Sequence, residues 1–197
     1  TGILYDPAEP QRCFDELAAV NAAQARGHPV YAQVGVSSQT IVFTMTSPLP
    51  FEGLKVWRPV FALYQDRDAL AAQYRDPGFR QSLREELVAP ADFPKLFTEQ
   101  WDYMEIVEVA RPENKHLEGR NIAELAAAEG ADPLDWFLDF GIADDFATCF
   151  CAATLNYHDD EVERLLLDPG GHPSLSDGGA HLAMLCDAGF GLHMLGH

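Results

Sequence analysis

The order of apolar and polar residues along the chain predicts helices that alternate with strands. Residues 10–26 repeat apolar positions at helical spacing, and Gly27 follows where a helix often ends in a left-handed conformation. Residues 29–36 are then nearly all apolar and rich in β-branched and aromatic side chains, which is typical of a buried strand. A helix, a glycine turn and an apolar strand in this order indicate an α/β protein with parallel strands.

Prolines divide the middle of the chain into short pieces. Residues 37–59 predict a long loop, and the apolar spacing favours helices at residues 59–74 and 79–87. Long loops in compact domains are often functional. We therefore expect residues 37–100 to form a mainly helical lid or insertion within a single partial domain that covers residues 1–197.

The last third of the chain again alternates between strand and helix patterns. Residues 103–109 alternate apolar and polar side chains and predict a strand. Asn121 and Asp132 each precede an apolar helical stretch and are expected to be N-caps. The remaining expected elements are a helix at residues 159–167, a short strand at residues 173–177 and a helix from Leu182 onward.

The charge balance argues against several classes of partner. The chain has 13 Lys and Arg residues against 31 Asp and Glu residues, a formal net charge of -18. Such a surface repels phosphate groups, so we expect neither nucleic acid nor an anionic membrane as a partner. The sequence contains no run of about 18 apolar residues, so it predicts no transmembrane helix. The four cysteines are irregularly spaced and predict no disulfide framework, which favours a cytoplasmic location.

The most informative stretch for chemistry is S-D-G-G, residues 176–179. Asp177 would lie at the carboxyl end of a short strand, where α/β barrels place catalytic groups. Gly178 and Gly179 would let the backbone approach a ligand closely. Taken alone, the pattern is more often an ordinary turn in which the aspartate bonds to its own backbone.

The residues around this stretch resemble a known family. The run L-S-D-G-G-A-H-L-A-M-L-C-D-A-G, residues 175–189, resembles a segment of the amidohydrolases that include the N-acyl-D-amino-acid deacylases. E-G-R-N-I-A-E-L at residues 118–125, followed by D-P-L-D at residues 132–135, is similar to a segment that precedes the family's last barrel strand. The resemblance implies the last strands and helices of a (β/α)8 TIM barrel, interrupted by a mainly helical lid.

The resemblance also implies a mechanism. Asp177 matches the family's aspartate at the end of strand eight, which contacts the metal site and acts as general base and then general acid in amide hydrolysis. The implied substrate is an N-acyl amino acid or a related small-molecule amide. The implied cofactor is zinc, as one or two ions whose ligands lie mostly on earlier strands outside this chain.

Two features indicate that the chain is only a piece of such an enzyme. It does not begin with Met, and its seven histidines include no H-x-H pair of the kind that would bind the metal. We expect this piece alone to be inactive and to bind metal weakly or not at all. Its natural partner would be the remainder of its own chain or a further copy of itself.

Further residues are candidates for substrate binding. His181 follows Asp177 by four residues and would contact substrate, although a capping or core histidine is the more common role. Gln33 and Ser37 lie at the end of the strand at residues 29–36, on the face where a barrel would place substrate contacts, although such residues often only form turns. Gly178 and Gly179 complete this candidate set.

Other clusters have ordinary structural explanations. His193 and His197 are spaced like a metal-binding pair but stand at the end of the chain. Cys149 and Cys151 would share one side of a strand as small apolar residues. The acidic clusters at residues 144–145 and 159–161 are expected to be solvated starts of helices.

Two non-catalytic functions remain as alternatives. A partial barrel would expose strand edges and apolar faces, so the chain could be a self-associating fragment without activity. It could also be a binding domain for a small acyl ligand. The aromatic residues that would line that domain, which are also typical of a plain core, are Phe43, Phe51, Trp57, Phe61 and Trp101.

Overall fold

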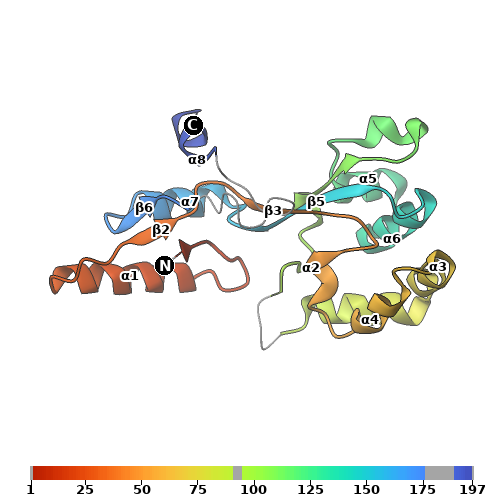
Figure 1. The fold of residues 1–197 in the computed structure, drawn as a ribbon, viewed down its shortest axis with the longest axis horizontal. Coiled ribbons are helices and arrows are strands. Elements are labelled where there is room, and N and C mark those ends of the chain that lie inside the picture. Colours follow the sequence, from red (N-terminus) through yellow and green to blue (C-terminus); the bar gives the residue numbers. More distant parts are fainter. Residues whose placement is uncertain (1, 91–94, 176–188, 197) are drawn as a thin grey trace. The chain divides into compact units, whose positions relative to one another are not determined.

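The computed structural model describes residues 2–90, 95–175 and 189–196 (Figure 1). The chain forms two compact units. One consists of Thr1–Thr40 with Ala153–His197, and the other of Ile41–Ala152. Each unit has its own hydrophobic core. The mixed α/β class predicted from the sequence is confirmed, whereas the described strands form two three-stranded sheets and close no barrel.

The first unit is built on a parallel sheet in the order β1-β2-β6. Helix α1 lies between β1 and β2 in the chain, and α7 precedes β6. Strand β1, from the start of the chain, pairs with β2, so the parallel sheet contains three described strands. The elements are β1 (Gly2–Ile3), α1 (Arg12–Ala25), β2 (Ala32–Val34), α7 (Asp159–Leu166), β6 (Gly171–Pro173) and a further helix α8 (Phe190–Gly196).

The parallel sheet has one covered face and one exposed face. Side chains alternate along a strand, so Ala32 and Val34 of β2 point to the side where Leu17 of α1 and Leu165 of α7 complete a buried cluster. Gln33, between them, points to the other side and is exposed. It is in register with His172 of β6, which is also exposed. Parallel sheets are usually covered on both faces.

The second unit contains an antiparallel pair, β4 with β5, in a sheet ordered β3-β5-β4. Strands β3 and β5 each run from one unit into the other. Helices and 3-10 turns fill the rest of the unit. The elements are β3 (Gln39–Phe43), α2 (Leu49–Glu52), η1 (Arg58–Leu63), α3 (Arg67–Arg75), α4 (Pro77–Val88), η2 (Trp101–Tyr103), β4 (Met104–Glu108), η3 (Pro112–Leu117), α5 (Ile122–Glu129), α6 (Pro133–Ala143) and β5 (Cys149–Leu155).

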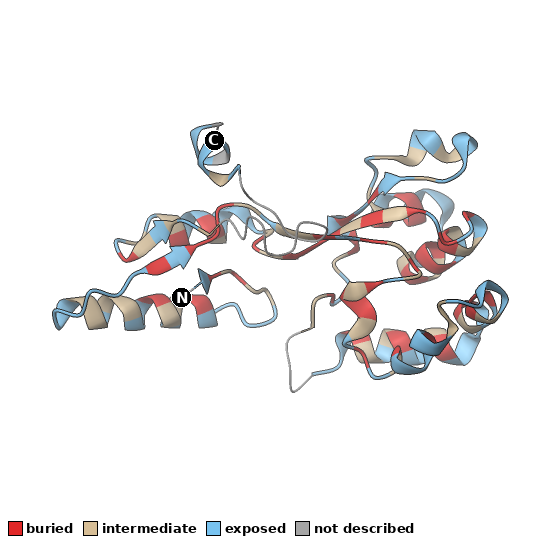
Figure 2. Ribbon diagram, in the orientation of Figure 1, coloured by how far each residue is buried: buried red, intermediate tan, exposed pale blue. Residues whose placement is uncertain are grey.

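Aromatic side chains dominate the core of the second unit. The buried stretches of its helices and strands are red in Figure 2. The Phe51 ring stacks on Trp57 with 5.1 Å between centroids, and on Phe137 at 5.5 Å. Phe43 and Trp101, also suggested as acyl-ligand contacts, are buried in the same core. Phe61 differs, with 42% of its surface exposed. Four of the five aromatic candidates therefore have the core role.

Local signals at helix ends are confirmed. The Asn121 side chain accepts a hydrogen bond from the Glu124 backbone N–H at 2.8 Å and begins α5. Asp132 caps α6 in the same way, through Asp135 N at 3.1 Å. Gly27 has the left-handed φ of 85° that the turn after α1 requires.

Other element boundaries were wrong. The stretch expected to be a loop at residues 37–59 contains β3 and α2, because the alternating sequence Q-T-I-V-F forms a half-buried strand. The helix expected at residues 59–74 is split into η1 and α3. Asp66 causes this break, since its side chain accepts a hydrogen bond from Ala69 N and starts a new helix.

The other differences concern length and grouping. The strands expected at residues 29–36 and 173–177 are shorter, at Ala32–Val34 and Gly171–Pro173. The lid expected at residues 37–100 falls largely within the larger unit Ile41–Ala152, and its role as a lid stays a prediction. In the part of the chain that the structure describes, no helix is long and apolar enough to cross a membrane.

Candidate functional site

The carboxyl ends of the three parallel strands meet at one edge of the first unit's sheet. Tyr5 follows β1, Gly35 follows β2 and Ser174 follows β6. Backbone hydrogen bonds hold these ends together, from Gly35 N to Ile3 O at 3.3 Å and from Ser174 N to Val34 O at 3.4 Å. This edge is where proteins with parallel sheets place their ligands.

The side chain of Asn156 joins two of these strand ends. Its Oδ1 accepts a hydrogen bond from Tyr5 N at 2.9 Å. Its Nδ2 donates to Gly35 O at 2.9 Å and to Ser37 O at 3.2 Å. The backbone N–H of Asn156 also donates to Tyr5 O at 2.9 Å. One residue therefore fixes the backbone that follows both β1 and β2.

Asn156 is suited to this position by its chemistry. It is buried, with 1% of its surface exposed, so each of its polar atoms needs a partner. Its φ of 62° is left-handed, a conformation that asparagine tolerates better than most residues. It follows directly after β5, the strand that returns from the second unit.

Gly35 is required by the close approach of its neighbours. A Cβ atom at this position would lie 2.4 Å from Leu4 Cδ2 and 3.2 Å from Asn156 Nδ2. A side chain there would push against the same carboxamide that binds its carbonyl oxygen. The glycine thus lets the carboxamide reach the end of β2.

Tyr5 packs beneath this edge as a neutral phenol. Its ring meets the His158 ring edge-on at 5.5 Å between centroids and also packs with Phe14. Burial, and secondly the charge of Glu161, raise the pKa of the Tyr5 hydroxyl above its usual value. Tyr5 therefore stays protonated at neutral pH and cannot serve as a base.

The candidate site residues from the sequence fall into two groups. Gln33 is exposed on β2, and Ser37 is half-buried at the edge, where its carbonyl oxygen binds Asn156. Ser38, beside it, is exposed. The other candidates, Asp177, Gly178, Gly179 and His181, lie outside the described residues. Asp177 follows the last residue of β6, Pro173, by four positions.

The cysteine and histidine pairs provide no described site. Cys149 and Cys151 lie partly buried on β5, as expected. Burial, and secondly Glu108, raise the pKa of the Cys149 thiol, which keeps it in the unreactive protonated form. His193 lies in α8, whereas His197 is outside the described residues. Among the residues with described positions, no three His, Cys, Asp or Glu side chains are grouped to hold a metal ion.

The two acidic clusters have different outcomes. Asp159, Asp160 and Glu161 form the first turn of α7, as predicted. The prediction for Asp144 was wrong, because this residue follows the end of α6 and has no exposed surface. Its carboxylate accepts hydrogen bonds from three neighbours and has a structural role.

Asn156 is the residue that sequence reasoning missed. The pattern that could have indicated it is a polar residue directly after the apolar stretch C-A-A-T-L. In the structure His158, two positions further on, meets the Tyr5 ring edge-on. Nothing in the local sequence identifies its partners, which lie 151 and 121 positions away at Tyr5 and Gly35.

Comparison with known proteins finds similarity but no family. No protein-family model and no solved structure matches the chain. Uncharacterized proteins from Mycobacterium tuberculosis and Mycobacterium bovis are 31% identical to it over 123 residues. The match covers 61% of this chain but 19% of each relative's length. The chain is thus similar to a small part of much longer proteins.

Proposed function

We propose that this chain supplies the last strands of a metal-dependent amidohydrolase barrel. The reaction is the hydrolysis of a non-peptide C–N bond, in an N-acyl amino acid or a related small-molecule amide. The observation that carries the proposal is the parallel order β1-β2-β6 together with Asp177 of the S-D-G-G stretch, which follows the end of β6 at Pro173 by four positions. A cytoplasmic location belongs to the same proposal.

The first unit has the features of a segment of barrel wall. Its strands are parallel, and α1 and α7 cover a single face of them. The opposite face carries Gln33 and His172, both exposed. In a (β/α)8 barrel the helices lie outside and the second face points into the interior. The face that stays exposed here is the face that a complete barrel would enclose.

In the proposed reaction Asp177 transfers the proton. Its carboxylate would take a proton from the attacking water and then give it to the leaving amine. One residue can serve both steps if it stands at the end of a strand, close to both atoms. Gln33, Ser37 and His181 would contact the substrate.

The proposed zinc requires ligands from elsewhere. The described residues contain no group of three side chains that could hold a metal. The ligands would therefore come mostly from strands outside this chain. We expect the 197-residue chain alone to bind zinc weakly and to hydrolyse nothing, and tight one-to-one zinc binding in a calorimetric titration would contradict this.

The test of activity uses the full-length gene product that contains this chain. Release of free amine is measured with N-acetyl-D- and N-acetyl-L-amino acids, and Asp177→Asn is compared with Asp102→Asn, an exposed aspartate of the second unit. We expect Asp177→Asn to lower kcat by about 100-fold or more, as is usual when a general acid–base group is removed. The proposal fails if no amide is hydrolysed, or if Asp177→Asn keeps full activity.

A second function, self-association without catalysis, is favoured by the exposed face of the parallel sheet. Within the described residues β1 and β6 are edge strands, and Tyr31, beside this sheet, is 59% exposed. Such edges pair readily with other strands. Gel filtration of the 197-residue chain distinguishes the two, since this alternative requires a stable dimer or larger assembly.

A further inference from the structure

We infer that Asn156 is the positioning residue of the proposed site. Its carboxamide is hydrogen-bonded to the backbone that follows β1 and β2. Through that backbone it influences the positions of Ser37 and, further along β2, Gln33. The inference rests on the proposed function for its catalytic meaning, but the contacts themselves are independent of it.

The surroundings of the Asn156 side chain require a carboxamide. One backbone donor, Tyr5 N, faces its Oδ1, and two backbone acceptors, Gly35 O and Ser37 O, face its Nδ2. A carboxylate has no hydrogen to donate, and an aliphatic side chain would leave all three groups without this partner. Asparagine combines these atoms with tolerance of the left-handed φ.

These contacts act on the residues that would meet a substrate. Ser37 is bound directly through its carbonyl oxygen. Gln33 stands two residues before Gly35, whose carbonyl is bound as well and whose N–H is held by Ile3 O. Gln33 itself is paired with Gly2 of β1 and His172 of β6, so a shift of Asn156 acts directly on Ser37 and reaches Gln33 only through the end of β2.

Asn156 also links the two chain segments that leave and re-enter the first unit. Ser37 precedes β3, by which the chain leaves the first unit, and Asn156 follows β5, by which it returns. A second bond at the same place runs from Thr154 Oγ1 to Gln39 O at 3.2 Å. The outgoing and returning segments are therefore joined where they border the site.

The experiment replaces the carboxamide by a carboxyl group of the same shape. Asn156→Asp keeps the acceptor for Tyr5 N, but while ionised it places a negative charge against Gly35 O and Ser37 O. Protonation at low pH restores one donor. We expect kcat/KM of the full-length protein, on its best N-acetyl-amino-acid substrate, to fall about 10- to 100-fold relative to wild type at neutral pH. Burial and the two facing carbonyl oxygens raise the pKa of the new carboxyl above its usual value of about 4, so the ratio of variant to wild type should recover as the pH falls through that raised pKa.

Two variants serve as references. Asn121→Asp changes a half-buried helix cap whose side chain accepts a hydrogen bond from Glu124 N, a role that a carboxylate also fills, so its activity should match wild type at every pH. Asn156→Gly relieves the left-handed backbone and removes the side chain, so it should lose activity without recovery at low pH. Equal pH profiles for Asn156→Asp and Asn156→Gly would overturn the inference.

A readout on the 197-residue chain separates this inference from the proposed function. Amide NMR signals of Gln33 and Ser37 should shift in Asn156→Asp and return toward their wild-type positions at low pH. If they do so while no amide substrate is hydrolysed, the positioning role stands and the proposed reaction fails. Unchanged signals at Gln33 and Ser37 in both Asn156 variants would refute the positioning role, whatever the activity.

Discussion

At the scale of single residues, the buried carboxylate of Asp144 shows how a polar side chain can stabilise a fold. Its Oδ2 accepts hydrogen bonds from Ala110 N and Thr148 Oγ1, both at 2.7 Å, and its Oδ1 accepts one from Asn114 Nδ2 at 3.0 Å. These bonds join the segment after β4 to the end of α6. Burial acts to raise the pKa of Asp144, but the hydrogen bonds outweigh it and hold the pKa below its usual value.

Asp144→Asn should destabilise the protein by about 2–3 kcal/mol, because the new amide nitrogen would face a donor that needs an acceptor. The pH dependence has a definite sign. The folded-state pKa is lowered, so the carboxylate's contribution is fully present above the unfolded pKa of about 4 and is lost as the pH falls through the folded pKa. Urea denaturation of both proteins at several pH values measures this difference.

The control for this prediction is Asp102→Asn, which removes an exposed carboxylate from the same unit. Its free energy of unfolding should stay within about 0.5 kcal/mol of wild type. A gap between wild type and Asp144→Asn that stays constant down to pH 2 would contradict the assigned role of the charge.

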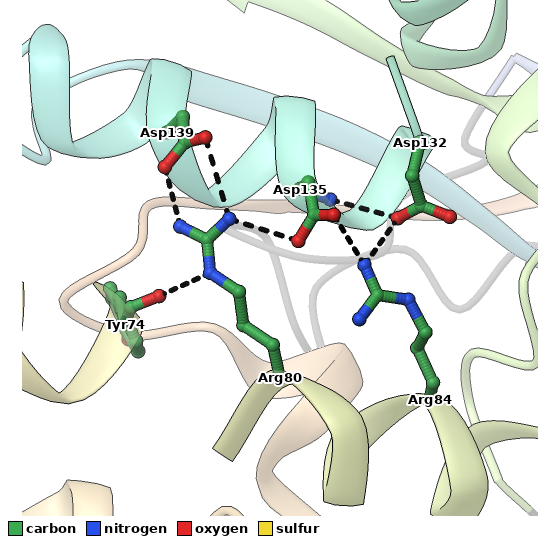
Figure 3. Close-up of polar contacts among 6 residues, drawn as sticks. All are labelled: Tyr74, Arg80, Arg84, Asp132, Asp135 and Asp139. Carbon is green, nitrogen blue, oxygen red and sulfur yellow. Dashed lines mark hydrogen bonds and ion pairs between the residues drawn. The ribbon is translucent and has the colours of Figure 1, made fainter. Parts of the chain in front are cut away.

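At the scale of elements, two arginines of α4 bind three aspartates of α6 (Figure 3). Asp132 is the N-cap of this helix, and Asp135 and Asp139 lie within it. Arg80 donates to Asp135 Oδ1 at 2.9 Å, to Asp139 Oδ1 at 2.5 Å and, through Nε, to Tyr74 O at 2.7 Å. Arg84 donates to Asp132 Oδ1 at 2.8 Å. The guanidinium fork thus joins α3, α4 and α6.

The same network affects a helix cap. Burial acts to raise the pKa of Asp132, but the hydrogen bonds from Arg84 and from Asp135 N lower it below its usual value. Asp132 therefore caps α6 as a carboxylate and binds α4 at the same time. The sequence predicted the cap, whereas the arginine partner is visible only in the fold.

Arg80→Lys should cost about 1–2 kcal/mol of stability, because a lysine cannot reach two aspartates and the Tyr74 carbonyl at once. The Arg80 side chain is 12% exposed, so water screens its ion pairs little. Arg84 is 29% exposed, and Arg84→Lys should cost less. Denaturation midpoints of both variants give the order.

The matched control is Arg12→Lys in α1. The Arg12 side chain is 55% exposed and pairs with near neighbours in sequence, Glu9 just before the helix and Glu16 within it. Its effect should be about 0.5 kcal/mol or less. If Arg80→Lys is no more harmful than Arg12→Lys, the network does not hold α4 to α6.

At the scale of the whole molecule, the two units differ in how completely their cores are covered. The core of Ile41–Ala152 contains the large aromatic cluster around Phe51 and Trp57. The core of the first unit is smaller and lies under one face of its parallel sheet. Stability should therefore be concentrated in the second unit.

We expect residues 39–155, which keep β3 and β5 whole, to fold alone. The segment should show near-UV circular dichroism from its buried tryptophans and a cooperative thermal transition, because its core contains residues from this segment only. The 197-residue chain should show an earlier loss of the first unit's structure. A segment that unfolds without a cooperative transition would disprove this division.

The sequence determined the features that depend on neighbours along the chain. The α/β class, the caps Asn121 and Asp132, the glycine turn at Gly27 and most helices could be predicted, since each rests on contacts within a few residues. The short strand β3 was missed because its length gives a weak pattern. The sequence also provided the catalytic candidate, Asp177, through its resemblance to a family.

Only the tertiary structure decided what depends on residues far apart. It placed β2 between β1 and β6, gave Asp144 its three donors and gave Asn156 partners up to 151 positions away. The physical reason is that a buried polar atom must find a hydrogen bond, and the chain's path alone settles which distant group provides it. Local sequence specifies the donor and the acceptor, and the fold pairs them.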